Sequence, residues 1–117
     1  MKRILVVEDE ASLRLLYEQE LREEGYEVVT VESGEEALKK LEGDRIDLVV
    51  LDIRLTGMNG LEALEEMLLK NRNLKVIINT AYANYKDDFS SWLADAYLIK
   101  SSDLTELKAT IRKLLEQ

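Results

Sequence analysis

The sequence predicts an α/β protein built on a doubly wound parallel sheet, with five strand–helix units and the strand order 2-1-3-4-5. Short apolar runs alternate with segments whose apolar residues recur every three to four positions, which is typical of a parallel sheet with helices on both faces. The runs at 4–7, 48–51 and 75–78 are almost wholly apolar, as strands buried on both faces are. The run at 26–31 includes charged and polar residues, which indicates an edge strand.

The first half of the chain predicts two strand–helix units. After the run at 4–7, apolar residues at i, i+3, i+4 and i+8 predict a helix that Gly25 can end. Ser33 and Glu36 have the spacing of a capping box, so a second helix is expected to follow the strand at 26–31. The positions expected to face the core are Leu13, Leu16, Tyr17, Leu21, Ala37, Leu38 and Leu41.

The second half of the chain predicts three more units. Asn59 with Glu62 is expected to cap the helix after the strand at 48–51, and Asp103 with Glu106 is expected to cap the last helix. The other predicted segments are a strand at 75–78, a short helix with Phe89, Trp92 and Leu93, and a strand at 97–99. The inward positions of the two capped helices are Leu61, Leu64 and Leu68, then Leu104, Leu107, Ile111 and Leu114.

Composition limits the classes of protein to consider. The 117 residues fit one domain, which we expect to span residues 1–117, and 46% hydrophobic with 34% charged residues predicts a soluble globular chain. The absence of cysteine and histidine excludes disulfides, thiolate metal sites and a phosphohistidine on this chain. No apolar run approaches the roughly 20 residues of a membrane span and no signal peptide opens the chain, so a cytoplasmic location is expected. The formal charge of −8 argues against nucleic-acid binding through the overall field.

Acidic residues follow the two strands between which the order of the sheet reverses. In such sheets the ligand crevice lies at the carboxyl ends of these strands, here the first and the third. Glu8 and Asp9 follow the first strand and Asp52 follows the third, so the three carboxylates are expected to meet. They would repel one another unless a cation lies among them. With oxygen ligands alone, the candidates are Mg²⁺, Mn²⁺ and Ca²⁺, and a site with few carboxylates and room for water favours Mg²⁺ and a phosphate-bearing substrate.

Two further polar groups end the neighbouring strands. Thr80 brings a hydroxyl to the end of the fourth strand, and Lys100 brings an ammonium group to the end of the fifth. Taken singly, each has an ordinary interpretation as turn or surface chemistry. Together with the carboxylates, they are typical of phosphoryl transfer, in which positioning and charge neutralisation supply most of the catalysis.

Four segments, ILVVEDE, LVVLDIRLTGMNG, VIINTA and AYLIK, resemble the receiver domain of two-component response regulators, the CheY-like family. The resemblance spans essentially the whole chain and implies the flavodoxin-like (βα)5 fold. It implies a phosphoacceptor that assists its own phosphorylation and dephosphorylation rather than an enzyme. The implied partners are a sensor histidine kinase or histidine phosphotransfer protein and a downstream protein target, with no direct nucleic acid and no membrane insertion.

The resemblance also implies a role for each site residue. Asp52 would be the phosphoacceptor, taking the phosphoryl group from a phosphohistidine. Asp9 would bind Mg²⁺ directly, Glu8 would act through water, and the backbone carbonyl of Arg54 would be a further ligand. Lys100 would pair with the phosphoryl group.

The remaining implied roles concern the switch. Thr80 would turn inward to bond the phosphoryl group, and Tyr97 would follow from an exposed to a buried position. Ala81 is small and would leave room for the phosphoryl group. The family's readout surface is its fourth helix, fifth strand and fifth helix.

The chain departs from the family pattern in two places. Thr56 and Ser101 stand where many members have proline. Because a non-proline cis bond costs about 2.5–4 kcal/mol, we expect the Lys100–Ser101 bond to be trans. Only 19 residues separate Thr80 from Lys100, and those at 82–91 are weak helix formers, so we expect a short or irregular fourth helix, displaced from the family position.

Several alternatives remain open on the sequence. The receiver can act alone, as a phosphorelay intermediate or diffusible switch, or it can be part of a DNA-binding transcriptional regulator, or a poorly phosphorylated pseudo-receiver. An aspartyl-phosphate phosphatase of the haloacid dehalogenase type is disfavoured because Arg54 stands where that class has its acid/base aspartate. A flavin-binding module is disfavoured because acidic residues replace the phosphate loop after the first strand.

Overall fold

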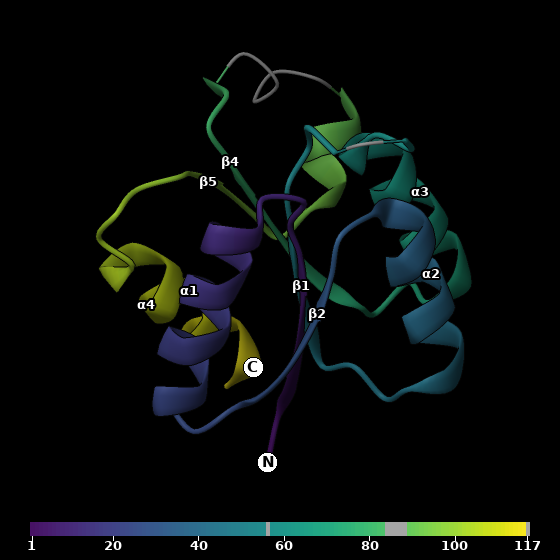
Figure 1. The fold of residues 1–117 in the computed structure, drawn as a ribbon. Helices are drawn as coiled ribbons and strands as arrows, with labels where there is room; N and C mark the ends of the chain where they lie inside the picture. The colour runs from purple at the N-terminus through teal and green to yellow at the C-terminus, as the bar shows by residue number, and fades with distance from the viewer. Residues whose placement is uncertain (56, 84–88, 117) are drawn as a thin grey trace.

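The protein folds as the predicted doubly wound parallel sheet; the computed structural model describes residues 1–55, 57–83 and 89–116 (Figure 1). All paired strands are parallel, in the order β2-β1-β3-β4-β5. The strands are β1 (Arg3–Val7), β2 (Glu27–Val31), β3 (Leu48–Leu51), β4 (Lys75–Thr80) and β5 (Ala96–Ile99). The helices are α1 (Ala11–Glu23), α2 (Gly34–Gly43), α3 (Gly60–Lys70), the 3₁₀ helix η2 (Phe89–Leu93) and α4 (Thr105–Leu115).

Helices cover both faces of the sheet, and each face has its own apolar core. In Figure 1, α1 and α4 lie on one side of the sheet and α2 and α3 on the other. Tyr17 and Ile111 are buried in the core under α1 and α4, whereas Leu64 and Met67 are buried in the core under α2 and α3. Because β3 contributes to both cores, all four of its residues are buried, as the apolar run predicted.

Two of the three predicted helix caps are confirmed. The side chain of Ser33 accepts a hydrogen bond from the Glu36 N–H, and that of Asn59 accepts one from the Glu62 N–H. The prediction for Asp103 was wrong: its carboxylate accepts from the Thr105 N–H at 2.9 Å, and the cap position belongs to the next residue. A carboxylate that bonds the N–H two residues ahead closes an Asx turn, which here replaces the capping box.

The predicted apolar stripes mostly face the cores, with one shift in α3. Leu64 is buried as predicted, but Leu61 and Leu68 pack only at the margin of the core. Ala63 and Met67 are fully buried instead. A Cβ on Gly34 would lie 3.1 Å from the Ala63 Cβ, so Ala63 packs close to the start of α2. The buried face thus includes positions that a stripe of leucines did not reveal.

The segment between β4 and β5 contains the predicted short helix. Its described part is the five-residue 3₁₀ helix Phe89–Leu93. The remainder of the prediction, an irregular and displaced fourth helix, falls on residues 84–88, which lie outside the described residues.

Candidate functional site

The strand register places the ends of β1 and β3 side by side. Val7 pairs with Leu51, and the Asp52 N–H donates to the Val7 carbonyl at 3.2 Å. The next residues, Glu8 and Asp52, therefore leave the sheet at the same level. This is the crevice position predicted from the reversal of strand order.

The three predicted carboxylates meet at this edge of the sheet. Glu8, Asp9 and Asp52 each offer an oxygen, and these oxygens lie within 4.8 Å of one another. Glu8 and Asp52 are only 2% and 5% exposed, whereas Asp9 is exposed. Two of the three carboxylates are thus buried and the third faces solvent. This arrangement suits a divalent cation such as Mg²⁺, which prefers oxygen ligands and keeps some of its water.

Lys100 lies between the two buried carboxylates, where the sequence predicted an ammonium group. Its Nζ is 2.6 Å from Glu8 Oε1 and 2.8 Å from Asp52 Oδ2. The backbone N–H of Glu10 donates to the other Glu8 oxygen at 3.0 Å. Three carboxylates and one ammonium leave two negative charges, which is the charge that one divalent cation would neutralise.

The pKa shifts follow from burial and this pairing. Burial raises the pKa of Glu8 more than the hydrogen bonds from Lys100 and from the Glu10 backbone lower it. Burial acts to lower the pKa of Lys100, but the hydrogen bonds and charges of Asp52 and Glu8 outweigh it and raise that pKa. Lys100 is therefore a fixed positive charge at neutral pH, available to an anionic group placed on Asp52.

Gly60 fixes the backbone on which Asp52 stands. Its N–H donates to the Ile53 carbonyl at 2.8 Å, which joins the start of α3 to the end of β3. A Cβ at this position would lie 2.2 Å from the Asp52 carbonyl oxygen, closer than any unbonded contact allows. Glycine is required here because the two backbones lie so close together. This contact fixes the backbone of Asp52 and so helps to orient its carboxylate.

Thr80 and Tyr97 are joined through Tyr82, a link that the sequence did not predict. Thr80 is fully buried, and its Oγ1 accepts from the Tyr82 N–H at 3.4 Å. Tyr97 is half-buried, and its hydroxyl donates to the Tyr82 carbonyl. The proposed inward movements of Thr80 and Tyr97 are therefore connected by one residue, although the switch itself stays a prediction.

Arg54 lies at the rim of the site, close to Asp52. Its backbone N–H is 3.4 Å from Asp52 Oδ1, and its guanidinium carbon is 4.4 Å from the centroid of the Tyr82 ring. The stacked pair of Arg54 and Tyr82 is a cation–π contact that sequence reasoning missed. The role of the Arg54 backbone carbonyl as a metal ligand remains a prediction.

Comparison with known proteins supports the same interpretation. A family model described as the response regulator receiver domain matches residues 4–112. The chain belongs to the response regulator receiver domain family. The response regulator TrrA of Thermotoga maritima, solved in complex with Mg²⁺ and BeF, is 52% identical, with a TM-score of 0.95 over 97% of this chain and 99% of TrrA. TrrA has also been solved in complex with the histidine kinase ThkA, with 52% identity and a TM-score of 0.93 over 98% of this chain and 99% of TrrA.

Two curated relatives of this receiver domain differ in length. Sporulation initiation phosphotransferase F of Bacillus subtilis is 32% identical over 116 residues, which cover 97% of this chain and 94% of that protein. The alkaline phosphatase synthesis transcriptional regulatory protein PhoP of Bacillus subtilis is 34% identical over 121 residues, which cover 99% of this chain but 49% of PhoP. The receiver domain thus spans about half the length of PhoP and of several other curated relatives.

Every peptide bond among the described residues is trans, so the predicted trans bond between Lys100 and Ser101 is confirmed.

Within the same described residues, none of the helices has the length and apolar character needed to cross a bilayer.

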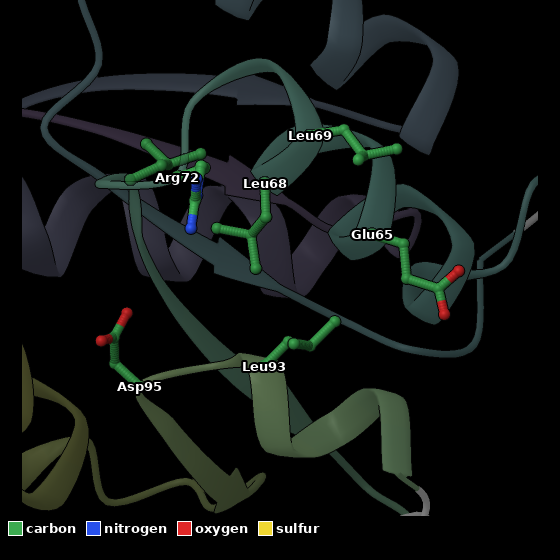
Figure 2. Close-up of a pocket in the computed structure, with 7 residues that line it drawn as sticks. Glu65, Leu68, Leu69, Arg72, Leu93 and Asp95 are labelled. Atoms are coloured by element: carbon green, nitrogen blue, oxygen red, sulfur yellow. The ribbon is translucent and has the colours of Figure 1, made fainter.

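A separate hollow lies between α3 and η2 (Figure 2). It has a volume of about 720 Å³, with Leu68, Leu69 and Leu93 as its apolar walls and Arg72 opposite Asp95 at one end. It shares no lining residue with the carboxylate cluster. The chemistry predicted from the sequence therefore belongs to the open rim at Asp52 and not to this hollow.

Proposed function

We propose that this receiver domain accepts a phosphoryl group on Asp52, with a phosphohistidine of a sensor kinase or a histidine phosphotransfer protein as the donor. The observation that carries the proposal is the position of the Asp52 carboxylate, which lies within 4.8 Å of the Glu8 and Asp9 oxygens and 2.8 Å from the Lys100 ammonium. The complex of TrrA with the histidine kinase ThkA supports this choice of donor.

The transfer exchanges one phosphorus bond for another. An oxygen of Asp52 attacks the phosphorus, and a new O–P bond forms as the P–N bond to the donor imidazole breaks. The imidazole keeps the electron pair of the P–N bond and takes a proton from solvent. The product is an acyl phosphate on Asp52, whose added charge Lys100 would partly neutralise.

The donor set fits Mg²⁺. Glu8, Asp9, Asp52 and the backbone carbonyl of Arg54 would hold the ion, because all are oxygen ligands and three carboxylates converge here. When bound, Mg²⁺ supplies positive charge to the oxygens of the transferred group. The structure of TrrA with Mg²⁺ and BeF supports this assignment.

The switch would carry the change to the surface. The Thr80 hydroxyl would donate a hydrogen bond to the phosphoryl group, and the small side chain of Ala81 would leave room for that group. Because Tyr82 joins Thr80 to Tyr97, movement of Thr80 would move Tyr97 on β5. The face formed by η2, β5 and α4 would then bind a downstream protein target.

We propose that residues 1–117 form one receiver domain that acts alone. The likeness to sporulation initiation phosphotransferase F, 94% of which this chain covers, supports that role. A second candidate is the receiver part of a DNA-binding transcriptional regulator, which the match to about half of PhoP favours. In either case we propose a phosphoacceptor that assists its own phosphorylation and dephosphorylation rather than an enzyme with a separate substrate, and a cytoplasmic location remains part of the proposal.

Acetyl phosphate with Mg²⁺ tests the proposal directly. We expect intact mass measurement to show one added phosphoryl group on the wild-type protein and none on Asp52→Asn. Asp44→Asn is the matched control, because Asp44 follows α2 and belongs to no part of the site, and it should be phosphorylated like the wild type. Equal phosphorylation of Asp52→Asn and the wild type would overturn the assignment, and no phosphorylation of either would indicate a pseudo-receiver.

A further inference from the structure

Two polar side chains are buried together in the apolar core under α1 and α4. The Asn79 side-chain amide donates to the Tyr17 hydroxyl at 3.1 Å, and the two residues are 5% and 2% exposed. Their neighbours in this core are aliphatic, among them Ile77 and Leu98. Because a buried hydroxyl or amide is unfavourable unless it is hydrogen-bonded, this pair forms a specific link between α1 and β4.

Asn79 lies near the end of β4, next to the residue that contacts the Lys100 backbone. Asn79 precedes Thr80, whose carbonyl accepts from the Lys100 N–H at 2.7 Å. Asn79 and Ser101 also line one hollow of about 320 Å³ beside the start of α4. The end of β4 is therefore hydrogen-bonded to the Lys100 backbone and lies near Ser101.

Lys100 has to cross the end of β4 to reach its partners. It follows β5, whereas Asp52 follows β3 and Glu8 follows β1, and β4 lies between β5 and β3. A lysine side chain has several rotatable bonds, so the direction in which it crosses depends on the support beneath it. The position of the β4 terminus consequently sets where the ammonium group lies above Asp52.

The charges of the site reach the Tyr17 hydroxyl. Burial raises the pKa of Tyr17, and the hydrogen bond from Asn79 acts to lower it. The Lys100 charge also acts to lower that pKa, and the charges of Glu8 and Asp52 act to raise it.

We infer that Tyr17 and Asn79 are positioning residues for phosphoryl transfer, whose buried hydrogen bond fixes the end of β4 and thereby holds Lys100 over Asp52. The inference rests on the proposed function of Asp52. Neither residue touches the reacting atoms, and both act through the lysine.

The test separates positioning from stability by comparing single and double variants. Tyr17→Phe and Asn79→Leu each leave one polar group buried without its partner, so each should lower the urea midpoint. Each should also slow phosphorylation by acetyl phosphate with Mg²⁺ about three- to tenfold, because Lys100 loses its alignment. The double variant leaves no unpaired group, so its urea midpoint should recover while its phosphorylation stays as slow as in the single variants. A double variant that recovers both would show a purely structural role and overturn the inference.

A second comparison tests whether the pair acts through Lys100. In a Lys100→Ala background, Tyr17→Phe should slow phosphorylation further by less than about twofold, because the lysine that it positions is already absent. The same slowing with and without Lys100 would contradict the inference. Tyr26→Phe is the matched control, since Tyr26 packs at the margin of the same core, and it should leave the rate unchanged. A wild-type protein that gains no phosphoryl group would defeat the proposed function itself, whereas normal rates in all variants would defeat only the positioning role.

Discussion

Asp52 directly follows an apolar strand, and its negative charge is paired with the Lys100 ammonium group. Asp52 is 5% exposed, its carboxylate pairs with Lys100 at 2.8 Å, and the Arg54 backbone nitrogen lies 3.4 Å from its other oxygen. Lys100 also pairs with Glu8, so one ammonium group serves two buried acids. This arrangement is stable enough to form but leaves excess negative charge, which makes the site ready for a cation.

Removal of the Lys100 charge should lower the stability of the folded protein. Lys100→Met leaves Glu8 and Asp52 buried without a counter-charge, and we expect a loss of about 3 kcal/mol in the free energy of unfolding, measured in urea at neutral pH. Lys70→Met is the control, since Lys70 pairs with Glu42 on the surface, and it should change stability by less than about 0.5 kcal/mol. Equal effects of the two variants would contradict this account of the site.

The buried phenol of Tyr17 should make stability depend on alkaline pH. Burial raises the pKa of Tyr17 above its ordinary value of 10.0, so the folded protein holds the phenolic proton at pH values where the unfolded chain has lost it. Stability should therefore fall as the pH rises above 10, by up to about 1.4 kcal/mol per pH unit from this group. Tyr17→Phe should remove that part of the slope in urea unfolding curves recorded from pH 8 upward. A slope unchanged by the substitution would show that the phenol ionises freely in the folded protein.

The junction of β3 and α3 is the element that sets the Asp52 backbone. Gly60 begins α3 and packs directly on the Asp52 carbonyl, with the capping Asn59 beside it. Gly57, at φ 83°, supplies a left-handed turn in the same loop, and the Met58 N–H donates to a Glu35 carboxylate oxygen at 3.3 Å. The loop is thus hydrogen-bonded to α2 through Met58 and to β3 through Gly60, and these contacts help to position Asp52.

Gly60→Ala should damage both stability and phosphorylation. The new Cβ would meet the Asp52 carbonyl oxygen at 2.2 Å, so the backbone of β3 or α3 has to shift. We expect a loss of about 2–3 kcal/mol in thermal or urea unfolding, together with slower phosphorylation by acetyl phosphate.

Gly43→Ala is the matched control for this steric effect. A Cβ at Gly43, the last residue of α2, meets nothing within 4 Å. Its effect should stay within about 1 kcal/mol, in the stabilising direction, and phosphorylation should be normal. Similar behaviour of the two alanine variants would mean that the close approach at Gly60 does not position Asp52.

Local patterns in the sequence predicted the elements well, because strand runs, helix stripes and the caps at Ser33 and Asn59 depend on neighbouring residues. The convergence of Glu8, Asp9, Asp52 and Lys100 also followed, since strand order alone brings strand ends together. What the sequence did not predict depends on contacts between distant segments. The bond between Tyr17 and Asn79 joins residues 62 positions apart, and neither residue carries a local signal of its partner.

The order of the strands is what turns single residues into a site. β1 and β3 are neighbours although a whole strand–helix unit separates them in sequence, so acids from both reach one crevice. β5 lies at the edge of the sheet and carries Tyr97, and Lys100, the residue after it, pairs with Asp52. We therefore expect a change at Asp52 to reach η2 and β5 through the end of β4.

Trp92 should report this change at the surface. It lies on η2 with 68% of its surface exposed, next to the strand that carries Tyr97. Beryllofluoride with Mg²⁺, which imitates a bound phosphoryl group, should alter the fluorescence of Trp92, the chain's one tryptophan, in the wild type and leave it unchanged in Asp52→Asn. An equal response of both proteins would show that the signal does not come from the site.

The position of the acyl phosphate tests the central claim most directly. The wild-type protein is incubated with acetyl phosphate and Mg²⁺, reduced with borohydride, which converts an aspartyl phosphate into homoserine, and then mapped by peptide mass spectrometry. We predict homoserine at position 52 and at no other aspartate. Homoserine at Asp9 or at any other residue, with Asp52 unmodified, would contradict the account.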